Sequence, residues 1–95
     1  MNKQDIYEKI IKYLDKKGAI KIFVFGSYVR GEENPDSDID IIVDFKESKS
    51  LLELIEIEQE LTETIGIKVD LLTSKSISPY IYKNIENEME EIYER

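Results

Sequence analysis

The sequence predicts an α/β chain of the α+β type, in which helices cover one face of a three-stranded mixed sheet. Three short segments rich in β-branched and aromatic residues, 20–25, 38–45 and 67–72, are expected to be strands. Segments with helical periodicity precede, separate and follow them, so the expected order is helix, strand, turn, strand, helix, strand, helix. With 95 residues, 41% of them hydrophobic, the chain is expected to be one domain, residues 1–95, with a single modest core.

Two of the helices are indicated by periodicity together with end signals. The segment 5–17 places four apolar side chains on one helical face, namely Ile6, Ile10, Ile11 and Leu14. Ser50 begins a second helix, and Glu53, three places on, completes a capping box. This helix is expected to run to about residue 65 and to end at Gly66.

A last helix is predicted from Ser78 as its cap and Pro79 at its first helical position. Its buried side is expected to carry Ile81, Ile85, Met89 and Ile92. Tyr80 and Tyr93 are expected to border the core, and Tyr82 to face solvent. Contact with a partner protein is the alternative for these tyrosines, because tyrosine is enriched at interfaces.

The connections predict how the strands pair. A helix of about 16 residues joins 38–45 to 67–72, which fits a right-handed parallel crossover. Only a turn region, residues 27–37, joins 20–25 to 38–45, so these two strands are expected to be antiparallel. A single helical turn is expected at residues 27–30.

Side chains alternate between the two faces of a strand, so the sequence predicts which face is buried. In the segment 38–45 one face carries apolar residues, namely Ile39, Ile41, Val43 and Phe45. The other face carries Asp38, Asp40, Ile42 and Asp44. Asp70 shares its face with Lys68 and Leu72, so Asp38, Asp40 and Asp70 are expected to converge if the two strands are neighbours.

Composition excludes several classes of protein. Cysteine and histidine are absent, which excludes disulfides, thiolate metal sites and nucleophiles activated by histidine. The net charge of −8 opposes direct binding to nucleic acid, although the acidity equally fits solubility alone. No apolar run approaches the ~20 residues that span a bilayer, and no signal-peptide core is present, so a cytoplasmic location without membrane contact is expected.

The convergence of three carboxylates predicts a metal site. Like charges at ~4 Å repel by a few kcal/mol at an effective dielectric near 20, and a cation relieves that cost. Oxygen ligands without Cys or His select Mg²⁺, with Mn²⁺ as the substitute. Two such ions about 3.5–4 Å apart can serve phosphoryl or nucleotidyl transfer. Asp38, Asp40 and Asp70 are therefore the predicted metal-binding and catalytic residues.

A phosphate-binding turn is predicted on the other side of this cluster. Gly26 lets a ligand approach the backbone closely, and the turn after it presents N–H groups and the Ser27 hydroxyl. Arg30 lies one turn further on and can pair with phosphate. Ser37, directly before Asp38, is assigned to the same nucleotide-binding set.

Other interpretations of the acidic motif are open at this point. Asp36, Asp38, Asp40 and Glu47 occupy positions 1, 3, 5 and 12 of an EF-hand loop, but position 6 requires Gly and here is Ile41. The aspartates could also cap a strand and face water, and Asp70 could be an exposed residue of an edge strand. Neither a Walker loop nor the G-x-G-x-x-G pattern is present.

The combination of motifs identifies a family more specifically than any single motif does. Gly-Ser, ten further residues and then Asp-x-Asp before an apolar strand resembles the signature of the DNA polymerase beta-like nucleotidyltransferase superfamily. The string GSYVRGEENPDSDIDIIVDF is similar to the minimal nucleotidyltransferase, or MNT, branch, and KVDLL extends the resemblance along the whole chain. The resemblance implies the nucleotidyltransferase fold, with Asp38 and Asp40 binding both metal ions. It implies that Asp70 binds the catalytic ion and can help to deprotonate the nucleophile, and that Gly26 and Ser27 hold the phosphates.

The same resemblance implies a partner. MNT proteins typically accompany HEPN proteins, which are helical ribonuclease toxins, and members of the family transfer AMP from ATP to a tyrosine of the toxin. A Mg²⁺-dependent adenylyltransferase that acts as an antitoxin, with ATP and an HEPN toxin as partners, is therefore expected. Two alternatives remain: an antitoxin that neutralises its partner by binding alone, and a small-molecule nucleotidyltransferase whose acceptor pocket a second subunit completes.

Overall fold

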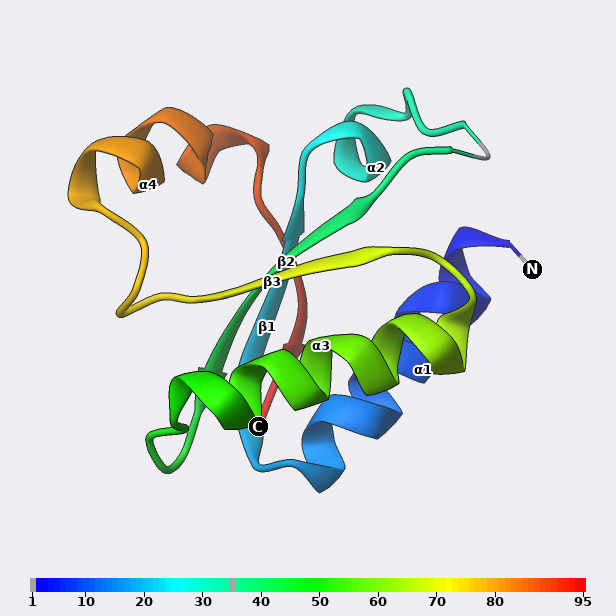
Figure 1. The fold of residues 1–95 in the computed structure, drawn as a ribbon. Coiled ribbons are helices and arrows are strands. Elements are labelled where there is room, and N and C mark those ends of the chain that lie inside the picture. Colours follow the sequence, from blue (N-terminus) through cyan, green and yellow to red (C-terminus); the bar gives the residue numbers. More distant parts are fainter. Residues whose placement is uncertain (1, 35) are drawn as a thin grey trace.

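The computed structural model describes residues 2–34 and 36–95, and within them it forms a four-stranded mixed sheet with helices (Figure 1). The strands are β1 (Ala19–Phe25), β2 (Ile39–Phe45), β3 (Val69–Thr73) and β4 (Glu90–Glu94), in the order β3-β2-β1-β4. The helices are α1 (Lys3–Lys16), α2 (Ser27–Arg30), α3 (Leu51–Ile65) and α4 (Pro79–Ile85), and the 3-10 turn η1 (Glu86–Glu88) follows α4. The α+β class and the order of elements up to the start of α4 are confirmed.

The three predicted strands pair as their connections indicate. β1 and β2 are antiparallel, with Val24 opposite Ile41, because only the turn region and the short α2 lie between them. β2 and β3 are parallel, with Asp40 beside Asp70, because α3 carries the chain back across the sheet. The predicted topology of these three strands is therefore confirmed.

The predicted last helix is wrong beyond Ile85. The helix α4 stops there, and the chain passes through η1 into β4, which pairs antiparallel with the outer edge of β1. Without β4, that edge would leave a row of N–H and C=O groups of β1 without backbone partners. Met89 and Ile92 are therefore not on a helix, and Ile92 packs against the core from the strand. The described sheet thus has four strands instead of three.

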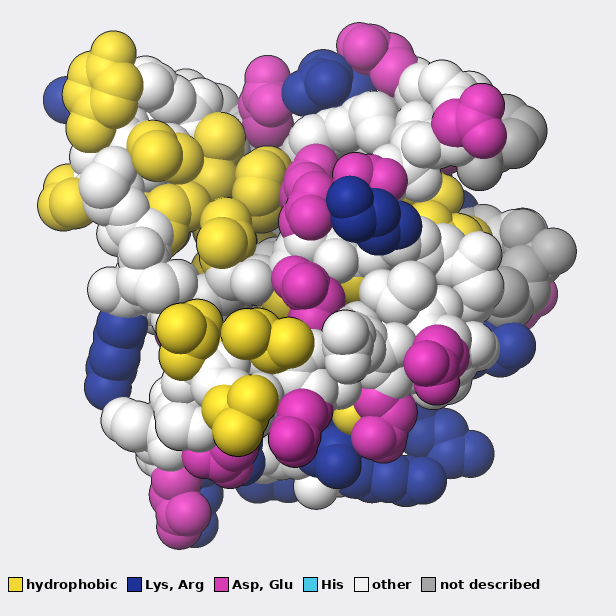
Figure 2. Space-filling model, in the orientation of Figure 1, with side chains coloured by type: hydrophobic (Ala, Val, Ile, Leu, Met, Phe, Trp, Pro, Cys, Tyr) yellow, Lys and Arg dark blue, Asp and Glu magenta, His cyan; other side chains and the backbone are white. Residues whose placement is uncertain are grey.

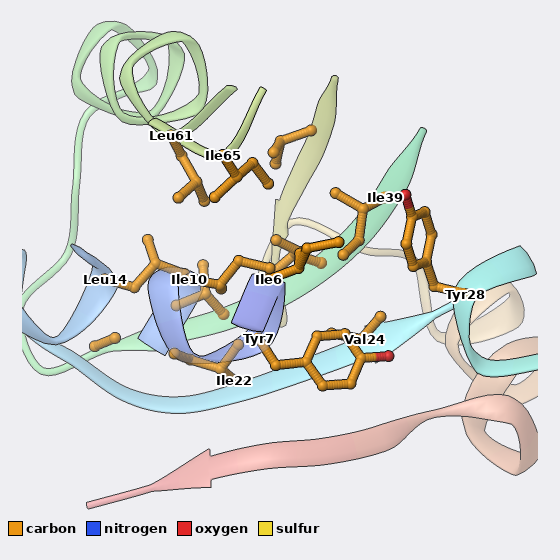
Figure 3. Packing of buried hydrophobic residues seen from close by; sticks show 14 of the residues in the cluster. Ile6, Tyr7, Ile10, Leu14, Ile22, Val24, Tyr28, Ile39, Leu61 and Ile65 are labelled. Carbon is orange, nitrogen blue, oxygen red and sulfur yellow. The ribbon is translucent and has the colours of Figure 1, made fainter. Parts of the chain in front are cut away.

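The hydrophobic core lies between one face of the sheet and the two helices α1 and α3 (Figures 1 and 3). Figure 3 shows that side chains of both helices point toward those of β1 and β2. The fully buried members include Ile10, Leu14, Ile22, Val24, Ile39, Ile41, Val43 and Leu61. Burial of each such side chain stabilises the fold by about 1.5–3 kcal/mol, which makes this layer the main source of stability. The predicted apolar face of the second strand is confirmed.

The helix ends follow local sequence signals. In α3 the Ser50 hydroxyl accepts the Glu53 N–H at 3.1 Å, and the Glu53 carboxylate accepts the Ser50 N–H at 3.0 Å, which confirms the capping box. Gly66 ends α3 with a φ of 74°, a conformation that glycine adopts without strain. In α1 the Asn2 side chain caps the start by accepting the Asp5 N–H at 2.9 Å. None of the described helices is both long and apolar enough to cross a membrane.

The tyrosines of the C-terminal segment are placed differently from the prediction. Tyr80 is 78% exposed, whereas Tyr82 is half-buried, so the predicted environments of these two residues are wrong. Tyr93, which lies in β4, packs against the core as predicted. The cause is that α4 stands away from the sheet (Figure 1) and buries none of its residues. Packing against the core therefore does not determine which side chains of α4 are apolar.

Candidate active site

The site begins where β1 ends. Gly26 follows β1 with a φ of 81°, and the single helical turn α2 then starts at Ser27, as predicted. A Cβ atom at position 26 would lie only 2.4 Å from the Asp40 Oδ2 atom. A side chain at this position would therefore displace the Asp40 carboxylate. The Gly-Ser turn and the acidic motif are in direct contact, and this contact requires glycine.

The prediction that the three aspartates lie together on one face of the sheet is confirmed. Asp40 in β2 and Asp70 in β3 are direct neighbours in the parallel register. Asp38 immediately precedes β2, two residues before Asp40, so it points to the same face. On that face the strand also carries Ile42, which is 1% exposed and lies between Phe23 and Leu72 in the sheet.

These residues line an open cavity of about 440 Å³. Every residue assigned to the site from the sequence borders it, namely Gly26, Ser27, Arg30, Ser37, Asp38, Asp40 and Asp70. Phe25, Ile85 and Glu88 complete the lining. A smaller cavity of about 140 Å³ lies near the other end of β2, beside Phe45 and Thr73, and contains none of the motif residues. The larger cavity is therefore the candidate active site.

The carboxylates in the cavity repel one another. The pKa of Asp40 is raised to about 6, and burial is the largest cause. The charge of Asp70, a hydrogen bond with Asp70 and the charge of Asp38 contribute to the same rise. The Arg30 guanidinium opposes this rise but does not offset it. The repulsion between the three aspartates is thus only partly compensated by nearby positive charge, and a bound cation would relieve the remainder.

The two nearby cations, Lys68 and Arg30, are each paired with acidic side chains. Lys68 Nζ lies 3.9 Å from Asp38 Oδ2 at the edge of the site. Arg30 places Nη1 3.1 Å from Glu88 Oε2 and Nε 3.3 Å from Glu32 Oε1. The guanidinium that the sequence assigned to phosphate is therefore engaged by two carboxylates.

The loop before β2 is organised by its own hydrogen bonds. The Asn34 N–H donates to Ser37 Oγ at 2.9 Å, and the Ser37 N–H donates to the Asn34 carbonyl oxygen at 2.9 Å. The Asp36 N–H donates to Asn34 Oδ1 at 2.9 Å, and Asp36 is exposed and does not line the cavity. Ser37 thus orders the loop and also borders the cavity.

Two of the alternative interpretations of the aspartates are not compatible with this geometry. An EF-hand needs a continuous 12-residue loop, whereas residues Ile39–Phe45 form the strand β2. β3 is an edge strand, but Asp70 is only partly exposed, because it lies beside Asp40 and lines the same cavity. The aspartates therefore belong to one site.

The donor chemistry of the cavity fits Mg²⁺ or Mn²⁺. Its potential ligands are carboxylate oxygens, with no sulfur or imidazole, and their repulsion is only partly compensated. In the described part of the chain, no three acidic side chains already stand as a ready-made ligand set, and Asp38 leans toward Lys68. An ion would therefore have to draw the Asp38 carboxylate away from Lys68 and toward Asp40 and Asp70.

Three lining residues were missed by the analysis of the sequence. Phe25 precedes Gly26, and its alternation with Ile22 and Val24 already places it on the face opposite the core. Ile85 and Glu88 carry no comparable signal, because they lie about 50 residues beyond the motif in a segment that resembles one continuous helix. Only the fold brings that segment to the cavity.

Comparison with known sequence families gives a match over nearly the whole chain. Residues 8–95 match the family described as "Polymerase beta, Nucleotidyltransferase". A Methanocaldococcus jannaschii protein that carries the provisional name protein adenylyltransferase is 48% identical over 88 residues. The match covers 93% of this chain and 95% of that protein. Protein adenylyltransferase MntA of Thermococcus cleftensis is 47% identical over 75 residues, covering 79% of this chain and 76% of its own.

Several solved structures with a similar fold come from toxin–antitoxin complexes. A chain of a toxin–antitoxin crystal structure with AMP-PNP superposes with a TM-score of 0.85 at 27% identity, covering 94% of this chain and 73% of that chain. A chain from the complex of tri-AMPylated Shewanella oneidensis HEPN toxin with MNT antitoxin gives a TM-score of 0.80 at 26% identity, covering 97% and 72%. These two chains are therefore similar to this chain in both fold and sequence.

Proposed function

Because this chain belongs to the polymerase beta nucleotidyltransferase family, we propose that it is a metal-dependent adenylyltransferase that transfers AMP from ATP to a tyrosine of an HEPN toxin and thereby acts as an antitoxin. The observation that carries the proposal is the contact between the two halves of the motif. Gly26 approaches the Asp40 carboxylate, and Asp40 and Asp70 lie side by side in register. A phosphate-binding turn and a cluster of carboxylates therefore share one cavity.

The proposal gives each of these residues a role. Gly26 and the first turn of α2 allow phosphate oxygens to approach the backbone N–H groups, and the Ser27 hydroxyl donates to them. Asp38, Asp40 and Asp70 would hold Mg²⁺, or Mn²⁺ in its place, which when bound supplies positive charge to offset that of the triphosphate. Arg30 adds a guanidinium at the same cavity.

The reaction is an in-line substitution at the α-phosphorus of ATP. The tyrosyl oxygen forms a bond to the α-phosphorus, while the bond from that phosphorus to the bridging oxygen breaks and pyrophosphate leaves. In this proposal the hydroxyl proton passes to a carboxylate at the cavity, and Asp70, on the strand beside Asp40, accepts it. No histidine is required, in agreement with its absence from the chain.

The decisive experiment replaces the acidic pair. In Asp38→Asn with Asp40→Asn, transfer should fall below detection because amides bind Mg²⁺ poorly, while the free energy of unfolding should not decrease since like charges are removed. The measurement is the mass of the HEPN partner after incubation with ATP and Mg²⁺. A partner that gains AMP units with the native protein and none with the double variant is the expected result.

Asp36→Asn is the matched control, because Asp36 is an exposed carboxylate of the same loop that does not line the cavity. It should retain transfer. The proposal of an enzyme fails if the native protein adds no nucleotide with Mg²⁺ or Mn²⁺, while native and double-variant proteins neutralise the partner equally. That outcome would identify an antitoxin that acts by binding alone.

A further inference from the structure

One ion pair joins the motif to the C-terminal segment. Arg30 ends α2 and Glu88 ends η1, 58 positions apart in the sequence, and their Nη1 and Oε2 atoms are 3.1 Å apart. Both side chains line the candidate active site, and the pair is exposed to solvent. The pair therefore stands in the cavity that a nucleotide would enter.

The charge balance of this cavity makes the pair significant. Among its described lining residues, the negative groups are Asp38, Asp40, Asp70 and Glu88, and Arg30 is the only cation. Asp40 contacts the turn at Gly26 and lies beside Asp70, and the negative charges of the three aspartates attract cations and repel a triphosphate. Arg30 is the one lining side chain that can bind a phosphate directly through charge.

The same pair is the main polar attachment of the segment that contains α4 and η1. Helix α4 buries none of its residues. In the described part of the chain, the Arg30–Glu88 pair is the only hydrogen bond or ion pair that joins residues 79–88 to residues outside 78–89. Loss of this pair would therefore loosen α4 and η1 without disturbing the core.

We propose that Glu88 competes with the triphosphate for Arg30, so that nucleotide binding exchanges the carboxylate for a phosphate and releases the α4–η1 segment. The proposal rests on the proposed function in one respect, that the ligand of the cavity is a nucleoside triphosphate. An exposed ion pair is weak, so a phosphate group can displace it. Glu88 is thus a residue that sets nucleotide affinity and couples the cavity to the exposed helix α4.

The first test measures binding of AMP-PNP with Mg²⁺ by calorimetry. Glu88→Gln should tighten binding about two- to fivefold, because one of the two exposed ion pairs of Arg30 is lost, with that to Glu32 remaining, and one repelling charge is removed from the cavity. Glu86→Gln, an equal change of charge in the same turn at a residue that does not line the cavity, should change binding less than Glu88→Gln does. Weaker or unchanged binding in Glu88→Gln would overturn the proposal.

A double-variant cycle separates competition for Arg30 from simple repulsion. In the background of Arg30→Gln, Glu88→Gln should bring little further gain, since the group for which Glu88 competes is gone. An equal gain in both backgrounds would show that Glu88 acts only by its charge, and the competition would be refuted. No binding of AMP-PNP to any form would refute both this inference and the proposed function, whereas binding without AMP transfer would leave the competition standing and refute transfer alone.

The second test follows the helix itself by hydrogen exchange. Addition of AMP-PNP to the native protein should increase exchange of the amides of residues 80–88, and Glu88→Gln should reach the same increase without nucleotide. Amides of β2 serve as the internal control because that strand belongs to the core. Unchanged exchange of the α4 amides in both cases would overturn the coupling of the cavity to α4.

Discussion

The helices α3 and α4 begin alike and end up in different environments. Ser50 Oγ accepts the Glu53 N–H at 3.1 Å, and Ser78 Oγ accepts the Ile81 N–H at 3.2 Å, so each helix starts at a serine cap. Yet α3 buries Ile57, Leu61 and Ile65, whereas α4 buries no residue. A cap thus determines where a helix begins, and packing determines how much the helix contributes to stability.

The difference is visible on the surface of the molecule. Figure 2 shows hydrophobic side chains gathered over the region that Figure 1 labels α4. Tyr80 and Ile81 are exposed there, at 78% and 50%. The helix α3 exposes apolar residues only near its start, at Leu51, Leu52 and Ile55, before its buried stripe begins. Four predictions test the contrast between the two helices and their surroundings.

The largest expected effect is in the core stripe of α3. Leu61→Ala should lower the free energy of unfolding by about 2–5 kcal/mol, because Leu61 is fully buried and the substitution leaves a cavity. Ile81→Ala on α4 should lower it by less than about 1 kcal/mol. Urea denaturation followed by circular dichroism measures both. Losses of similar size would show that α4 is part of the cooperative core after all.

The caps should differ in the same direction by a smaller amount. Ser50→Ala should cost about 1 kcal/mol of global stability, since the cap holds a helix that forms part of the core. Ser78→Ala should change global unfolding less, because α4 can open locally while the core stays folded. Hydrogen exchange should show the loss of protection in α4 itself. An equal global cost for both caps would contradict this distinction.

The strand β4, which follows α4, should respond to pH through its attachment to α1. The Tyr93 hydroxyl donates to Asp15 Oδ1 at 2.6 Å and Arg95 Nη2 donates to the same atom at 2.9 Å, and together they hold the pKa of Asp15 below its usual value. A lowered pKa in the folded state contributes stability above about pH 4 that is lost as the pH falls through the folded-state value. Asp15→Asn should therefore be less stable than the native protein at pH 7, by less than Ser50→Ala.

The measurement is urea denaturation of native and Asp15→Asn proteins at pH 7 and at pH 3. The difference between them should shrink at the lower pH, because the stability that the lowered pKa of Asp15 contributes is lost as the pH falls below the usual aspartate value. Asp5→Asn, a change of the same kind at the opposite end of α1, controls for general effects of charge. A difference that stays constant across this pH range would mean that the Asp15 carboxylate does not hold β4.

The smallest effect on stability is expected at the exposed positions. Tyr80→Ala on α4 and Leu51→Ala on α3 should each change the free energy of unfolding by no more than about 0.5 kcal/mol, because these side chains are 78% and 75% exposed. Titration of both variants against the HEPN partner then separates solvent exposure from partner contact. Loss of affinity in Tyr80→Ala alone would favour contact through α4, and unchanged affinity in both would count against an interface at either position.

The strands of the site could be predicted because their information is local. Alternation places Asp38 and Asp40 opposite the apolar residues of β2, and the length of α3 requires β3 to return parallel to β2 beside it. The Gly-Ser turn and the serine caps were likewise recognisable, since each depends on the chemistry of a few adjacent residues. Among the residues assigned from the sequence, all seven border one cavity.

Only the tertiary structure determined the C-terminal segment. Residues 79–94 have apolar spacing that fits a helix, and β4 replaces its second half because the open edge of β1 offers a row of backbone partners that no local pattern records. The turn from α4 into β4 brings Glu88 to Arg30, from 58 positions away, and leaves Tyr80 outside the core. Residues that are distant in the sequence become hydrogen-bond partners or neighbouring charges only when the whole chain has folded. This half of the cavity could therefore be recognised only in the folded protein.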